Sequence, residues 1–292
     1  MNIVDSLKDK VAELANKSVG YNRERVDGIH PIVLVDAVKS IIGLDFKRPN
    51  NKLLNWLDKD VLKYPSKNDI LKQKEHKVVN ASFRQLKEAL LNNQKSKVDE
   101  LLLNFNMLTD GTQLVEFFLE MSLYQSGLSF INIWRSFKMF KFIKLNDKLS
   151  FYKLLAHFLL SDKFRNDICL DSCDKDIQNI NNNDFDIILF ANFSDCSEMK
   201  FIRQNSIQIA LNSMQWNILS KTQLNDSIEI SYDGKSKNRL EILNLIDSQV
   251  FTYSQTNILL LDSIRMLIKS NSKISSSFLD NIYSKLDNHD LQ

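Results

Sequence analysis

Glycine and proline are scarce in this chain, which has only six glycines and three prolines among its 292 residues. Sandwiches, barrels and Rossmann units need these two residues at their tight turns, because glycine adopts positive φ and proline fixes φ. The chain has too few of them for the many turns of such folds. The scarcity therefore predicts an all-α fold, an irregular multi-helix bundle of antiparallel helix hairpins.

Composition and charge narrow the class further. Hydrophobic residues make up 43% of the chain, enough to bury a large core, and 38 Lys and Arg face 36 Asp and Glu. A net charge of +2 provides no global field for polyanions, so nucleic acid is not expected as a partner. The N-terminus has no secretory signal, and the most apolar stretch, 128–145, contains four basic residues. These features and an odd cysteine count predict a cytoplasmic protein without a transmembrane segment and with free thiols.

Apolar residues recur at helical spacing along most of the chain. Helices are predicted near residues 4–14, 31–42, 53–62, 82–93, 98–105, 114–124, 129–144, 148–161, 198–221, 239–251, 256–269 and 275–286. Pro31 suits the first position of its helix, and Gly43 is expected to end that helix in a left-handed conformation. Segment 184–193 fits either a short helix or a strand, whereas 227–232 is interpreted as a loop.

One polar stretch suggests how the chain is organised. Residues 166–184 are acidic and rich in Asn, which is typical of a linker or an excursion from the fold. We therefore divide the chain into a helical core domain, 1–165, and a second helical region, 185–292, that could pack on the first.

Familiar catalytic motifs are missing from the sequence. It has no GxxxxGK[ST], GxGxxG, GxSxG, HExxH or paired CxxC. His76 and His289 are expected in solvent. His30 either caps the helix that it precedes or faces a cavity, and His157 is interpreted as a histidine at the edge of the core. If His30 and His157 met in space, with Asp36 or Glu120 beside them, they could bind a metal or transfer a proton.

A basic and aromatic segment provides the other candidate site residues. Arg135, Lys138, Lys141, Lys144 and Lys148 lie among aromatic residues. Such cations can contact phosphates while the rings stack on bases, but the favoured interpretation is a core helix whose long cations reach water at its edges. Aromatic residues here either line a pocket or form plain core: Phe117, Phe118, Trp134, Phe137 and Phe140.

Three segments carry a resemblance to a known family. HPIVLVDAVKSIIG, LLNWLDKDVLK and LVEFFLEMSLYQSGLSFINIWRSFKMFKFIK follow one another in an order that resembles the helices of the questin oxidase-like all-helical proteins, over about residues 28–160. The resemblance implies a histidine that opens the early helix, matched by His30. It also implies a Gly-His-Lys where this chain has Ile133, Trp134 and Arg135, so one imidazole of the pattern is replaced. It implies an all-α scaffold more than a reaction.

Two functions follow as hypotheses. In the first, the chain binds a small apolar or aromatic molecule, or a protein partner, with Trp134, Arg135, Phe117 and Phe137 at the binding site. In the alternative it is an oxidoreductase or oxygenase that acts on a small organic substrate, with His30 and His157 as catalytic residues. A third class, an adaptor for RNA or a membrane surface, rests on the cations of 135–148. The sequence identifies no cofactor and no metal site, and it leaves the oligomeric state open.

Overall fold

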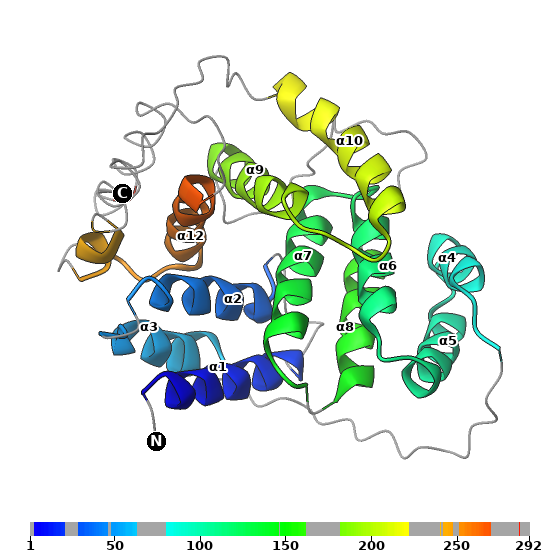
Figure 1. Cartoon of the computed structure of the whole chain (residues 1–292), viewed down its shortest axis with the longest axis horizontal. Helices are drawn as coiled ribbons and strands as arrows, with labels where there is room; N and C mark the ends of the chain where they lie inside the picture. Colours follow the sequence, from blue (N-terminus) through cyan, green and yellow to red (C-terminus); the bar gives the residue numbers. More distant parts are fainter. Residues whose placement is uncertain are drawn as a thin grey trace.

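The computed structural model confirms the all-α fold (Figure 1). It describes residues 3–20, 29–45, 48–62, 80–145, 147–161, 182–221, 240, 242–247, 251–269 and 286. Every regular element within these residues is a helix. No helix found in these ranges is both long and apolar enough to cross a membrane.

The helices follow the predicted order along the chain. They are α1 (Ile3–Val19), α2 (Pro31–Ile42), α3 (Asn51–Trp56) with its π-helical continuation η2 (Leu57–Val61), α4 (Phe83–Leu91), α5 (Lys95–Leu108), α6 (Thr112–Ser122), α7 (Gly127–Phe142), α8 (Lys148–Ser161), α9 (Asn182–Ser197), α10 (Gln204–Lys221) and α12 (Gln255–Lys269). The chain breaks between α5 and α6, and Gly111 precedes α6 as its N-cap residue with a φ of 90°.

The two ends of α2 test the helix signals of the sequence. His30 is the N-cap residue, and its Nδ1 accepts a hydrogen bond from the Ile32 backbone N–H at 3.2 Å. Pro31 follows at the first helical position, as predicted. The expected left-handed stop at Gly43 is wrong, because its φ is −61°. Instead, the chain leaves the helix through a tighter turn, in which the Leu44 N–H donates to the Ile41 carbonyl.

Two predictions for the later part of the chain can be compared with the structure. Segment 184–193 is helical, and α9 begins at Asn182, so the last three residues of the predicted linker belong to a helix. The single helix predicted over 198–221 starts only at Gln204, because residues 198–203 form a turn. Residues 166–181 and 227–232, and nearly all of 275–286, lie outside the described residues.

Helix α7 lies at the centre of the bundle (Figure 1). Helices α2, α6, α8 and α9 all pack against it, and α12 packs on both α2 and α9. Three helices from the predicted second region, α9, α10 and α12, thus pack on helices of the first. The α4–α5 hairpin lies at the edge of the molecule away from α3 and α12, and it contacts α8 (Figure 1). Because neighbours surround α7, most of its apolar side chains and the charged side chain of Arg135 are buried.

Candidate functional site

The first part of the site is an aromatic cluster of Trp134, Phe137 and Phe201. Trp134 is fully buried; its ring stacks on Phe137 at a centroid distance of 5.6 Å and meets Phe201 edge-on at 6.3 Å. Its indole Nε1 is buried and has no hydrogen-bond partner among the described residues. Buried indole N–H groups usually find an acceptor, so this donor is unusual.

Phe117 belongs to a neighbouring group of rings. It packs against Phe118 and Phe83, and the Arg203 guanidinium lies 5.6 Å from its ring centroid. The structure therefore places the predicted binding residues in two adjacent groups. Trp134 and Phe137 touch each other, and Phe117 lies with α4 and the start of α10.

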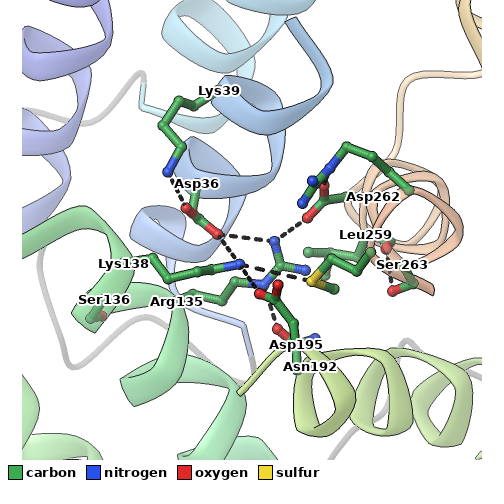
Figure 2. A network of polar contacts seen from close by, with 12 residues as sticks. Asp36, Lys39, Arg135, Ser136, Lys138, Asn192, Asp195, Leu259, Asp262 and Ser263 are labelled. Atoms are coloured by element: carbon green, nitrogen blue, oxygen red, sulfur yellow. Dashed lines mark hydrogen bonds and ion pairs between the residues drawn. The ribbon is translucent and has the colours of Figure 1, made fainter. Parts of the chain in front are cut away.

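The second part of the site is a buried network of charged side chains, which we call the charged cluster (Figure 2). Its members are Asp36 and Lys39 of α2, Arg135 and Lys138 of α7, Asn192 and Asp195 of α9, and Asp262 and Arg265 of α12. The central group is the Arg135 guanidinium. Its Nη1 donates to Asp36 Oδ2 at 3.1 Å and to Asp262, and its Nε donates to Asn192 at 2.6 Å.

Lys138 links the charged cluster to the aromatic cluster. Its Nζ lies 3.1 Å from Asp36 Oδ2 and 2.9 Å from Asp195 Oδ2. The same Nζ is 5.6 Å from the centroid of the Trp134 ring. Lys138 is therefore the side chain that contacts both clusters, which lie on neighbouring sides of α7.

The electrostatics of the charged cluster keep its carboxyls ionised. Burial alone would raise the pKa of Asp36, but the charges of Lys138, Lys39 and Arg135 outweigh burial and hold that pKa far below its ordinary value. Burial likewise opposes ionisation of Asp262, and Arg265, Arg135 and Lys138 together lower its pKa. For Arg135 the two carboxylates overcome burial and raise the pKa of the guanidinium. These are mutual effects of desolvated opposite charges.

The charged cluster has one cation, Arg135, and two carboxylates, Asp36 and Asp262, among its fully buried side chains, whereas Lys39, Lys138 and Arg265 are 18%, 17% and 15% exposed. Its ion pairs join four basic side chains, Lys39, Arg135, Lys138 and Arg265, to three carboxylates, Asp36, Asp195 and Asp262. In addition, Arg135 Nη2 is buried and has no hydrogen-bond partner within the described part of the chain. Two donors on consecutive residues, Trp134 Nε1 and Arg135 Nη2, are thus buried without an acceptor among the residues that the structure describes.

The interpretation that long cations of α7 reach water is wrong for Arg135, whose side chain is 0% exposed. It lies on the side of α7 that α2, α9 and α12 cover, so its charge is neutralised inside the protein. Lys141 fits the interpretation better, since its Nζ lies 4.6 Å above the Phe137 ring near the end of the helix. Lys148 donates to the Asp110 carbonyl at the surface.

The predicted catalytic histidines lie in a different environment. His30 is buried at the start of α2, where its backbone N–H donates to Asn132 Oδ1 and its ring meets Phe158 edge-on at 5.3 Å. His157, the neighbour of Phe158 in α8, is half-buried. Asp36 belongs to the charged cluster, and Glu120 pairs with Arg203 at 2.6 Å. The described residues contain no group of three or more His, Cys, Asp or Glu side chains that could hold a metal ion.

The turn at 198–203 covers the aromatic cluster. It places Phe201 against Trp134 and Phe137, and Glu116 of α6 accepts hydrogen bonds from the Ile202 and Arg203 backbone N–H groups at 3.1 and 2.8 Å. These two hydrogen bonds from the turn to Glu116 hold the turn against α6. Sequence reasoning missed both Glu116 and Phe201, because their partners lie more than 60 positions away in the chain.

Comparison with known proteins identifies no relative. No protein-family model matches the chain, and neither a curated protein nor a solved structure is significantly similar to it. The resemblance to the questin oxidase-like proteins stays a prediction from the sequence.

Proposed function

We propose that this protein binds a small aromatic or apolar molecule beside Trp134. The observation that carries the proposal is the Trp134 indole N–H, which is fully buried among aromatic rings and has no acceptor in the described structure. A ligand with a hydrogen-bond acceptor would satisfy this donor while its ring joins Phe137 and Phe201. Binding sites for small molecules combine such apolar walls with a few placed polar groups.

The turn at 198–203 offers the route to this position. Phe201 is the member of the aromatic cluster that lies in this mostly exposed turn. The apolar side chains of Met199 and Ile202 beside it are 37% and 63% exposed. A ligand enters, in this proposal, by displacing Phe201. The rest of the cluster lies on α7, which other helices hold on all sides.

The oxidoreductase alternative and the protein-partner alternative stay predictions from the sequence. His30 uses Nδ1 as a helix cap, which gives that nitrogen a structural role. Metal analysis and an ultraviolet–visible spectrum of the purified protein test the oxidoreductase alternative, because a stoichiometric metal or chromophore would favour it.

Isothermal titration calorimetry with 1-naphthamide tests the proposed function. This probe is neutral, has two fused aromatic rings and presents a carbonyl acceptor. We expect saturable binding of one molecule per chain. Trp134→Phe keeps an aromatic ring and removes the N–H, so its affinity should fall about threefold or more, the value of one neutral hydrogen bond.

The matched control is Trp56→Phe. Trp56 contacts Tyr253 and lies in α3, outside the aromatic cluster. Its replacement should leave the affinity unchanged. Absence of saturable binding to the wild-type protein, or an equal loss in both variants, would refute binding beside Trp134.

A further inference from the structure

We infer that the turn at 198–203 is a gate that opens and closes over the aromatic cluster, and that Arg203 is the residue that keeps this gate closed. The inference deepens the proposed function and rests on it, because the gate sets how fast a ligand reaches Trp134. It is carried by the way in which the turn is attached to the bundle. The attachments are one buried ring, a few hydrogen bonds to side chains, and one guanidinium group at the edge.

One ring attaches the inner side of the turn. Phe201 is the only buried residue of the turn, all of which the structure describes, and Met199 and Ile202 beside it are exposed. The centroid of the Phe201 ring lies 6.3 Å from that of Trp134 and 5.7 Å from that of Phe137. Opening of the gate therefore withdraws a single apolar side chain from the bundle, and it uncovers Trp134.

The backbone of the turn can move without unwinding the helices on either side. Helix α9 ends at Ser197 and α10 begins at Gln204. Between them, the N–H groups of residues 201–203 donate to side-chain oxygens, the first to Gln204 and the other two to Glu116. Water can replace these acceptors when the turn moves outward, and the backbone hydrogen bonds within α9 and α10 stay intact. A segment held by so few contacts opens at a lower free energy than the bundle unfolds.

Arg203 attaches the outer side of the turn to two helices. Its Nε and Nη2 both donate to Glu120 Oε2 of α6, at 3.0 and 2.6 Å. Its guanidinium, a planar group that can pair and stack at once, also lies 4.9 Å from the ring centroid of Phe83 and 5.6 Å from that of Phe117. The side chains of Arg203 and Glu120 are 21% and 14% exposed, so water competes for this pair when the turn moves. Arg203 therefore holds the gate closed and can also release it.

Acrylamide quenching of Trp134 fluorescence tests the gate without a ligand. The full chain with Trp56→Phe and Trp216→Phe has Trp134 as its one tryptophan. A closed gate keeps acrylamide from this buried indole, so quenching should be weak in this parent protein. Two further variants in the same background, Glu120→Gln and Arg203→Met, remove the carboxylate and the guanidinium of the pair. Each should raise the Stern–Volmer quenching constant about threefold to tenfold, because the open fraction of the gate rises.

Stopped-flow fluorescence with 1-naphthamide measures the effect of the gate on binding. Under the proposed function Phe201 is displaced in the complex, so only the open gate admits the ligand. The association rate constant should therefore rise in each variant by the same factor as the quenching constant, whereas the dissociation rate constant should stay unchanged. A role of Arg203 in stability alone would lower the melting temperature without linking these two factors. Glu120→Gln keeps the shape of the side chain, so the test does not depend on Arg203→Met being folded.

Glu88→Gln is the matched control, because Glu88 also pairs with an arginine, Arg84, but on the exposed surface of α4. It should change neither quenching nor association. Quenching at the level of the parent in both Glu120→Gln and Arg203→Met, or an equal rise in Glu88→Gln, would overturn the gate and leave the proposed function standing. Raised quenching in those two variants alone, without saturable binding of 1-naphthamide, would support the gate and overturn the proposed function.

Discussion

Arg135 carries its charge in the interior of the bundle, where both carboxylates that accept from it are equally buried. Burying these ions is unfavourable, since each loses its hydration. Removing only one partner is more unfavourable still, because the other charge then stays buried without a partner. The residue therefore fixes which helices must come together around α7. Asp36, Asn192 and Asp262 each belong to a different helix.

Arg135→Met is expected to lower the free energy of unfolding by about 3–5 kcal/mol, because it leaves two buried carboxylates without their central cation. Urea denaturation at pH 7 measures this loss. Arg84→Met is the control: Arg84 is 88% exposed and pairs with Glu88 on the surface of α4, so about 0.5 kcal/mol or less should be lost. A loss below about 1 kcal/mol for Arg135→Met would contradict the role of the charged cluster.

A companion variant separates the missing charge from the missing packing. Arg135→Met combined with Asp36→Asn and Asp262→Asn removes the carboxylates together with the cation. This triple variant should recover part of the loss, because the two fully buried carboxylates are gone and the cations that lose a partner, Lys39 and Arg265, are 18% and 15% exposed and can reach water. Recovery would assign the loss to the unpaired carboxylates.

At the scale of helices, local sequence signals predicted much of the fold. Helical spacing located most of the elements, and the apolar surface of 129–144 identified α7 as central. Where the signals failed, a contact distant in sequence was responsible. The helix predicted to start at 198 starts at Gln204, because Glu116 holds the preceding N–H groups in a turn. Gly43 has no need of a left-handed conformation, because nearby carbonyls accept from the N–H groups that follow the helix.

Glu116→Gln should loosen the turn that precedes α10. The carboxylate accepts from two backbone N–H groups, whereas the amide offers one oxygen and turns an N–H₂ group toward the second donor. We expect about 1–3 kcal/mol less protection of the Ile202 and Arg203 amides in hydrogen–deuterium exchange measured by NMR. Under the proposed function, the same variant should also speed association of 1-naphthamide.

The control for this variant is Glu88→Gln, which changes an exposed carboxylate in α4. It should leave the exchange of residues 202 and 203 as in the wild type. Wild-type exchange of these two amides in Glu116→Gln would show that Glu116 does not fix the turn.

At the scale of the whole molecule, the charged cluster joins segments from distant parts of the chain. Asp36 and Asp262 flank Arg135 at separations of 99 and 127 residues. No local pattern in the sequence reports such pairings, so a sequence-based interpretation placed Arg135 at the edge of a helix. The aromatic character of the site was predictable from composition. Its charge and its covering turn depended on tertiary contacts.

The charged cluster also sets how the whole fold responds to acid. The pKa values of Asp36 and Asp262 are lowered in the folded protein, so the unfolded chain binds protons more readily than the folded one. Their contribution to stability is therefore fully present above the ordinary aspartate pKa and is lost as pH falls through the folded values. We expect the free energy of unfolding to decline from about pH 5 downward, because both carboxyls take up protons more readily in the unfolded chain.

Carbon-13 NMR of the side-chain carboxyls assigns this decline to the cluster. At pH 3 an ordinary aspartate is mostly protonated, whereas the Asp36 carboxyl should keep the chemical shift of its ionised form for as long as the protein is folded. Its signal should change only with global unfolding, because α2 and α7 then separate and the cations leave the carboxylate. An Asp36 signal that titrated near pH 4 in the still-folded protein would show that Arg135, Lys138 and Lys39 do not hold its charge.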